Sequence, residues 1–200
     1  SHLHFVAADE YRNRVIQLGE YPDRVFNVGG MGIDAIKRIK LLSRKELEKS
    51  LELTFGERNL LVTFHPVTLE WGDSSAGQMR ELLAALEDIT LIFTMPNADT
   101  GGREISALVR EFVQAHPNAQ VYTSLGQLRY FSCLAQIDGV VGNSSSGLAE
   151  APSFSIGTVN IGDRQKGRLK AGSVIDCEPN RESIQAALET LYSDAFQSGL

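Results

Sequence analysis

The residues best suited to hold a ligand lie in the segment 139–150, where a short apolar stretch is followed by a glycine, an asparagine and three consecutive serines. A strand, a turn of small residues and a helix start bring unpaired backbone N–H groups and the positive end of a helix dipole to one point, which favours an anion. Ser144, Ser145 and Ser146 add hydroxyl donors, and Glu150 provides an acceptor for ribose hydroxyl groups. The pattern predicts a nucleoside diphosphate site, and its alternative is a flexible connection rich in serine.

Two further candidates follow other apolar segments of the chain. His65 comes directly after Leu60–Phe64 and before Pro66, and an imidazole there can donate to a phosphate or transfer a proton near neutral pH. The alternative for His65 is a hydrogen bond to the backbone within a turn. Arg164 opens a basic run after Thr158–Ile161, where a guanidinium can neutralise phosphate. A run of charges can equally be a solvated face.

Asn97 follows the apolar segment Leu91–Thr94 and a proline. Asn and Asp cap helices and form turns, which is the role we expect for nearby Asp99. Asn97 can act as a cap or line a ligand pocket, and the residues alone leave both open.

These candidates require a scaffold that brings strand ends together, and the hydrophobic pattern predicts one. Short apolar segments without polar alternation are typical of parallel strands covered on both faces, and the segments between them carry apolar stripes at helical spacing. We expect strands at Val25–Val28, Leu60–Phe64, Leu91–Thr94, Val121–Thr123, Gly139–Val141, Thr158–Ile161 and Ser173–Ile175. The alternation of strands and helices along the chain predicts an α/β fold, with a Rossmann-like parallel sheet and helices on both faces. Ligands of such sheets bind beyond the carboxyl ends of the strands, where the candidates fall.

The domain organisation follows from the same pattern. Residues 1–24 are expected to be the tail of a preceding domain, with a helix over about 8–18, and residues 25–195 a single Rossmann-like domain followed by a tail at 196–200. The chain begins without Met and inside an apolar segment, which indicates an excised fragment.

Composition restricts the partners. The 200 residues carry a formal net charge of -6, with a pI near 5.3, which argues against nucleic acid or an anionic membrane as the main partner. Two cysteines without metal-like spacing favour a reducing, cytoplasmic compartment. There is no signal peptide, and no apolar run reaches the ~18 residues of a membrane span.

Four segments, taken together and in order, resemble the hydrolysing UDP-N-acetylglucosamine 2-epimerases, in particular the branch that begins sialic acid and legionaminic acid synthesis. They are Thr63-Phe-His-Pro-Val-Thr68, Pro96-Asn-Ala-Asp99, Gly142-Asn-Ser-Ser-Ser-Gly-Leu-Ala-Glu150 and Asn160-Ile-Gly-Asp-Arg-Gln-Lys-Gly-Arg168. The likeness extends from Ser1 to about residue 195.

The resemblance implies two Rossmann-like domains that face each other across a cleft, the GT-B arrangement, with this chain supplying the C-terminal UDP-binding half. It also implies a reaction in which UDP is eliminated from UDP-N-acetylglucosamine, and water then adds to the 2-acetamidoglucal to give N-acetylmannosamine. No metal or nicotinamide cofactor is implied. The implied partners are the UDP-sugar, UDP, the missing N-terminal domain and, in some members, further copies of the chain.

Residue roles follow from the matched motifs. The resemblance implies a catalytic role near the sugar and diphosphate for His65, phosphate binding by Ser144 and Ser145, ribose binding by Glu150, diphosphate binding by Arg164 and a place in the nucleotide pocket for Asn97. The family's acidic groups for the C2 proton come mainly from the missing domain. We therefore expect the fragment to bind UDP weakly and not to turn over. The alternatives are the nucleotide-sugar half of a GT-B glycosyltransferase and a non-catalytic UDP-binding module.

Overall fold

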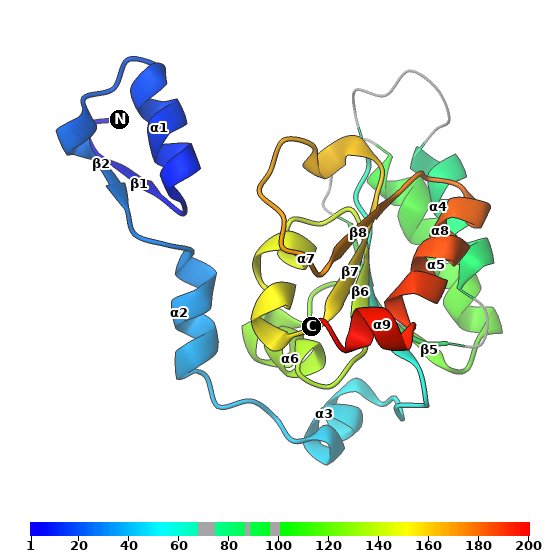
Figure 1. The fold of residues 1–200 in the computed structure, drawn as a ribbon. Helices are drawn as coiled ribbons and strands as arrows, with labels where there is room; N and C mark the ends of the chain where they lie inside the picture. Colours follow the sequence, from blue (N-terminus) through cyan, green and yellow to red (C-terminus); the bar gives the residue numbers. More distant parts are fainter. Residues whose placement is uncertain (68–74, 87–88, 97–100) are drawn as a thin grey trace. The chain divides into compact units, whose positions relative to one another are not determined.

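The computed structural model describes residues 1–67, 75–86, 89–96 and 101–200. The chain forms two compact units, an N-terminal unit at Ser1–Lys40 and a main unit at Leu41–Leu200 (Figure 1). Asn97 and Asp99 lie outside the described residues. None of the described helices is long and apolar enough to cross a membrane.

The N-terminal unit is a β-α-β motif followed by a helix. It consists of β1 (His4–Val6), α1 (Asp9–Gln17), the 3₁₀ turn η1 (Pro22–Arg24), β2 (Val25–Asn27) and α2 (Met31–Arg38). The helix expected over about 8–18 is confirmed as α1. The strand expected at Val25–Val28 is also present, but it pairs in parallel with β1 and not with the main sheet. The structure therefore divides at Lys40, whereas the pattern placed the domain boundary at residue 24.

The main unit alternates strands and helices along the chain. Its helices are α3 (Arg44–Leu51), α4 (Ser75–Ala85), α5 (Gly102–Ala115), α6 (Gly126–Leu134), α7 (Ser146–Ala149), α8 (Arg181–Leu191) and α9 (Asp194–Gln197). Its strands are β3 (Asn59–Thr63), β4 (Thr90–Thr94), β5 (Ala119–Tyr122), β6 (Gly139–Gly142), β7 (Gly157–Ile161) and β8 (Val174–Cys177). Two 3₁₀ turns, η2 (Ala151–Phe154) and η3 (Asp163–Gln165), complete it.

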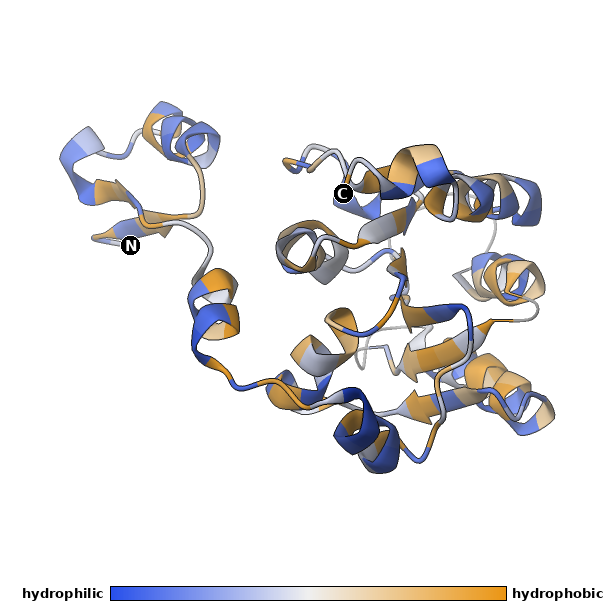
Figure 2. Cartoon of the chain, turned by 60° about the horizontal axis from the view of Figure 1, so that its bottom comes forward, coloured by the Kyte–Doolittle hydropathy of each residue, from blue (hydrophilic) through white to orange (hydrophobic). Residues whose placement is uncertain are grey.

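The six strands form one parallel sheet in the order β5-β4-β3-β6-β7-β8. Helices α4, α5 and α8 cover one face, and α6 and α7 lie on the other (Figure 1). Strands β3, β4, β6 and β7 are buried almost throughout, and in Figure 2 the strands are largely orange while the helices carry blue along part of their surface. The predicted α/β sheet with helices on both faces is confirmed.

The core explains why these segments pair. Leu60, Val62, Val141 and Val159 from neighbouring strands pack with α4, α5 and α8 in one apolar cluster, and each of these four side chains is at most 1% exposed. Burying apolar surface contributes about 25 cal/mol per Å², so this cluster stabilises the packing of the helices on the sheet. The sheet is therefore a rigid base for the loops at its carboxyl edge.

Candidate functional site

The candidate site lies where the strand order reverses. From β3 the chain proceeds through β4 to β5 on one side, and it then returns to place β6 against the other side of β3. Loops leaving β3 and β6 consequently diverge, and this switch point at the carboxyl edge is where ligands of open α/β sheets bind. His65 follows β3, Asn143 and the serines follow β6, and Arg164 follows β7, so the topology gathers three of the predicted segments at this point.

Asn143 joins the loops after β3 and β6. Its Nδ2 donates to the His65 carbonyl oxygen at 2.9 Å, and its Oδ1 accepts from the His65 N–H at 2.8 Å. The Asn143 N–H donates to the Thr63 carbonyl at 3.2 Å. Asn143 is 1% exposed and His65 8% exposed, so these bonds are formed away from water. The His65 main chain is thus bonded outside its own turn, to a side chain of another loop.

A glycine makes this close approach possible. Gly142 pairs with Thr63 in the β3–β6 register and has a φ of +138°. A Cβ placed on Gly142 would lie 2.0 Å from the Thr63 carbonyl oxygen. No other residue type fits there, because the backbone conformation and the space both require the absence of a side chain.

Arg164 reaches the same group from β7. Its Nη1 donates to the Asn143 carbonyl oxygen at 2.9 Å, and the Nε2 of Gln165 donates to that oxygen at 2.8 Å. None of the ion pairs among residues 1–67, 75–86, 89–96 and 101–200 involves Arg164. Its charge is therefore not neutralised by a described carboxylate, which suits a guanidinium that meets an anionic ligand.

The two lysines of the basic run differ from Arg164 in that both are paired with carboxylates. Lys166 pairs with Asp163 at 2.9 Å, and Lys170 pairs with Asp176 at 2.6 Å. The alternative of a solvated charged face thus describes these lysines better than it describes Arg164.

The serine segment leads into a short helix. Helix α7 has four residues, and the chain then changes to the 3₁₀ turn η2, which contains Pro152 and ends at Ser155 with a φ of +52°. A single turn sums few peptide dipoles, so hydroxyl and N–H donors rather than a helix dipole define this part of the site. Ser146 Oγ bonds Ser144 Oγ at 3.2 Å, and Ser145 Oγ makes no hydrogen bond to a described residue.

A cavity of about 420 Å³ opens beside the serines. Leu125 and Phe131 supply apolar surface, and Glu150 supplies a carboxyl group. Hydroxyl groups make up much of the rest, from Thr63, Thr94, Thr123, Ser124, Tyr130, Ser144 and Ser146. A pocket with an apolar wall and several convergent hydroxyls suits a flat, polar, sugar-bearing molecule such as a nucleoside.

Glu150 is the charged group of this cavity. Burial raises the pKa of Glu150 above its ordinary value. Its Oε2 is buried and has no hydrogen-bond partner among the described residues. A buried carboxylate oxygen without a donor is costly, and a ligand hydroxyl would remove that cost.

Tyr130 forms part of the same wall. Its hydroxyl lies 2.5 Å from Ser146 Oγ, and burial raises the pKa of Tyr130 to about 12. The phenol therefore stays protonated at neutral pH and acts as a hydrogen-bond group rather than a base.

The predicted site residues thus fall into two neighbouring groups. Ser144 and Glu150 line the cavity, while His65 and Arg164 meet at Asn143. Asn97 is not described. Asn143 and Tyr130 also belong to the candidate site, although neither was predicted as a site residue. The signals for Asn143 were its position one residue after a strand, next to Gly142, and its place in the matched segment 142–150.

No three His, Cys, Asp or Glu side chains in the described part of the chain gather closely enough to hold a metal ion.

Comparison with known proteins identifies relatives of this chain. A family profile described as UDP-N-acetylglucosamine 2-epimerase matches residues 1–199. The chain is 39% identical over 201 residues to a GDP/UDP-N,N′-diacetylbacillosamine 2-epimerase (hydrolysing) of Campylobacter jejuni, covering 98% of this chain and 52% of the relative. It is 34% identical over 208 residues to a UDP-N,N′-diacetylbacillosamine 2-epimerase (hydrolysing) of Legionella pneumophila, covering 100% of this chain and 55% of the relative. The chain therefore spans about half the length of the curated relatives it matches.

The fold is also found in solved structures. One is the UDP-GlcNAc 2-epimerase of Methanocaldococcus jannaschii in complex with UDP-GlcNAc and UDP, which matches with a TM-score of 0.71 at 16% identity. The match covers 97% of this chain and 55% of that one. At this identity the likeness establishes the shared fold.

Proposed function

Because the chain belongs to the UDP-N-acetylglucosamine 2-epimerase family, we propose that the protein, at the length of its relatives, is a hydrolysing 2-epimerase acting on a UDP-linked 2-acetamido sugar. The match over residues 1–199 is the observation that carries the proposal. UDP-N-acetylglucosamine is the first candidate substrate, with N-acetylmannosamine and UDP as products.

The second candidate substrate is UDP-N,N′-diacetylbacillosamine. Two relatives that are more than 30% identical to this chain over the aligned residues are named for that sugar. The two candidates differ at C4 and C6 of the sugar. By the resemblance, the pocket for these carbons lies largely on the other half, so an assay on both sugars has to decide.

In this proposal the half described here holds the nucleotide. The nucleoside occupies the 420 Å³ cavity, with its ribose hydroxyls donating to Glu150. The diphosphate lies over the loop after β6, where Ser144 and Ser145 provide hydroxyl donors. Arg164 faces the diphosphate from the loop after β7, and the resemblance implies a nucleotide-binding role for Asn97.

The chemistry would be an elimination followed by a hydration. The C2 proton leaves, the bond between C1 and the UDP oxygen breaks, and 2-acetamidoglucal and UDP are formed. Water then adds across the C1–C2 double bond and delivers a proton to C2 with the opposite configuration. Arg164 stabilises the charge that builds on the departing diphosphate, and His65 acts at the sugar and diphosphate. The acids and bases for C2 are supplied by the other half.

Calorimetric titration of this chain with UDP, UMP and uridine tests the binding step. Affinity should rise with each phosphate, because Ser144, Ser145 and Arg164 act on the diphosphate. Equal affinities for uridine and UDP would contradict the proposed diphosphate site.

Product analysis with the protein at the length of its relatives tests the reaction. Incubation of each UDP-sugar without an acceptor should release UDP and the free 2-epimerised sugar. Release that depends on an added acceptor would instead identify a glycosyltransferase. Tight UDP binding without any product would identify a non-catalytic module.

A further inference from the structure

We propose that Asn143 is a positioning residue, which sets the spacing between the His65 main chain and the Arg164 guanidinium. The inference rests on the proposed function, because it concerns the reaction assigned to that site.

The first support is that every polar group of Asn143 is bonded within the site. The side chain bonds both the N–H and the C=O of His65, the main-chain N–H bonds Thr63, and the carbonyl oxygen accepts from Arg164 and Gln165. One residue therefore links the loops after β3, β6 and β7, which leave three different strands.

The second support is the stiffness of the link. Asn has a short side chain with two rotatable bonds, and its paired amide bonds fix both of them. Gly142 on its amino side cannot be replaced without displacing Thr63, so the Asn143 backbone is anchored too. Reacting groups lose rate steeply when misplaced, by about 100-fold for 1 Å, so a rigid link between His65 and Arg164 is of direct use.

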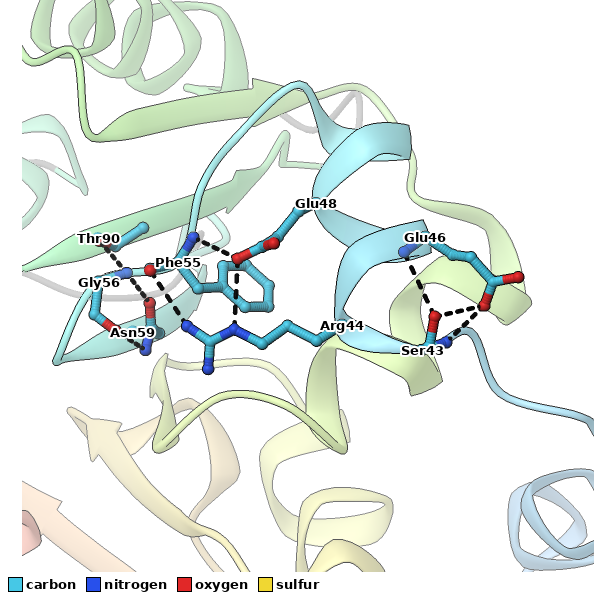
Figure 3. Close-up of polar contacts among 8 residues, drawn as sticks. All are labelled: Ser43, Arg44, Glu46, Glu48, Phe55, Gly56, Asn59 and Thr90. Carbon is cyan, nitrogen blue, oxygen red and sulfur yellow. Dashed lines mark hydrogen bonds and ion pairs between the residues drawn. The ribbon is translucent and has the colours of Figure 1, made fainter.

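The structure contains a matched control at the opposite end of β3. Asn59 is 3% exposed, and its side chain accepts from the Gly56 N–H at 2.9 Å and donates to the Gly56 carbonyl at 3.1 Å (Figure 3). Asn59 thus makes the same paired amide bonds as Asn143, with a similar degree of burial, at the amino edge of the sheet. Loss of the Asn59 side chain reports the structural cost of such a pair without touching the candidate site.

The experiment compares Asn143→Ala with Asn59→Ala in the protein at the length of its relatives. Both variants should lose stability to a similar extent. Only N143A should lower kcat, by about 10- to 100-fold, with KM changed by less than about threefold. A kcat of N143A that equals that of N59A would overturn the inference. If either alanine variant does not fold, Asn143→Asp and Asn59→Asp take their place, because Asp keeps the acceptor for the main-chain N–H and loses the donor.

A parent protein that is inactive on both UDP-sugars would refute the proposed function rather than the role of Asn143. Amide hydrogen exchange then decides the inference, because it needs no turnover. Addition of UDP to the parent should slow exchange at His65, since diphosphate contacts at Arg164 are transmitted through Asn143. N143A should abolish this slowing and N59A should keep it, and slowing that persists in N143A would overturn the inference.

Discussion

Substitution of Gly142 by alanine should destabilise the main unit more than any comparable change at a glycine of the carboxyl edge. The φ of +138° is disfavoured for a residue with a side chain. The new Cβ would lie 2.0 Å from the Thr63 oxygen and 2.7 Å from the Thr63 carbonyl carbon. Both atoms belong to the main chain and cannot rotate away, so β3 and β6 must separate at this point.

The loss of stability in Gly142→Ala has two contributions, backbone strain and weakened hydrogen bonds. A residue held in such a region of φ and ψ costs about 1–3 kcal/mol. Separation of the strands also weakens the Asn143 N–H bond to Thr63 and the paired bonds to His65, each contributing about 0.5–1.5 kcal/mol. The expected loss is about 3–5 kcal/mol, which is a large part of the ~5–15 kcal/mol that stabilises a typical domain.

Gly162→Ala is the matched control, because Gly162 follows the neighbouring strand β7 with a φ of +67°, and a Cβ added there would meet no atom within 4 Å. It carries only the backbone cost, about 1–3 kcal/mol, because a φ of +67° with a ψ of -166° is a region that residues with a side chain rarely adopt. Urea unfolding followed by far-ultraviolet circular dichroism measures both variants against the parent. If the free energies of unfolding of Gly142→Ala and Gly162→Ala differ by less than about 1 kcal/mol, the reasoning is refuted. Such a result would mean that β3 and β6 separate near Gly142 without a measurable loss of stability.

The remaining predictions concern ligand binding and pH. Ser145→Ala and Arg164→Ala should each weaken UDP binding by about 5- to 30-fold and leave uridine binding unchanged in calorimetry, with Lys166→Ala, already paired with Asp163, as the unaffected control. Burial raises the pKa of Glu150 in the folded protein, so this group contributes stability at low pH that is lost as the pH rises through the folded-state pKa. Glu150→Gln should therefore raise Tm at neutral pH while weakening uridine binding. A difference in Tm between Glu150→Gln and the parent that does not change from acidic to neutral pH would contradict the assignment of this pH effect to Glu150. Tyr130→Phe removes the bond to Ser146 and should cost about 0.5–1.5 kcal/mol in urea unfolding, without a new pH dependence below about pH 9.

The central strands of the sheet were predictable because they are buried on both faces. Leu60–Phe64 and Gly139–Val141 closely match β3 and β6, since an uninterrupted apolar run marks a strand of this kind. Val25–Val28 is also a short, mostly apolar segment, yet β2 pairs with β1 in the other unit. Local pattern indicates that a segment is a strand, while its partner depends on contacts between distant parts of the chain.

The candidate site was predictable to the level of loops. Residues just after strands were expected at one edge, and His65, Ser144, Glu150 and Arg164 follow their elements at that edge. Which of them share a cavity and which meet at Asn143 depends on side-chain reach and strand order. A lone asparagine after a glycine carries no chemical signal until β3, β6 and β7 are side by side.

The pairing of β3 with β6 has a consequence for the order in which the molecule folds. Every other neighbouring pair in the main sheet joins strands that are consecutive along the chain, whereas this one joins residues 59–63 with residues 139–142. Closing so long a loop is slow, because its entropy is lost before its contacts form. We therefore expect β3-β4-β5 and β6-β7-β8 to assemble as two triplets that join late, so that during refolding the proposed nucleotide site forms only after most of the secondary structure.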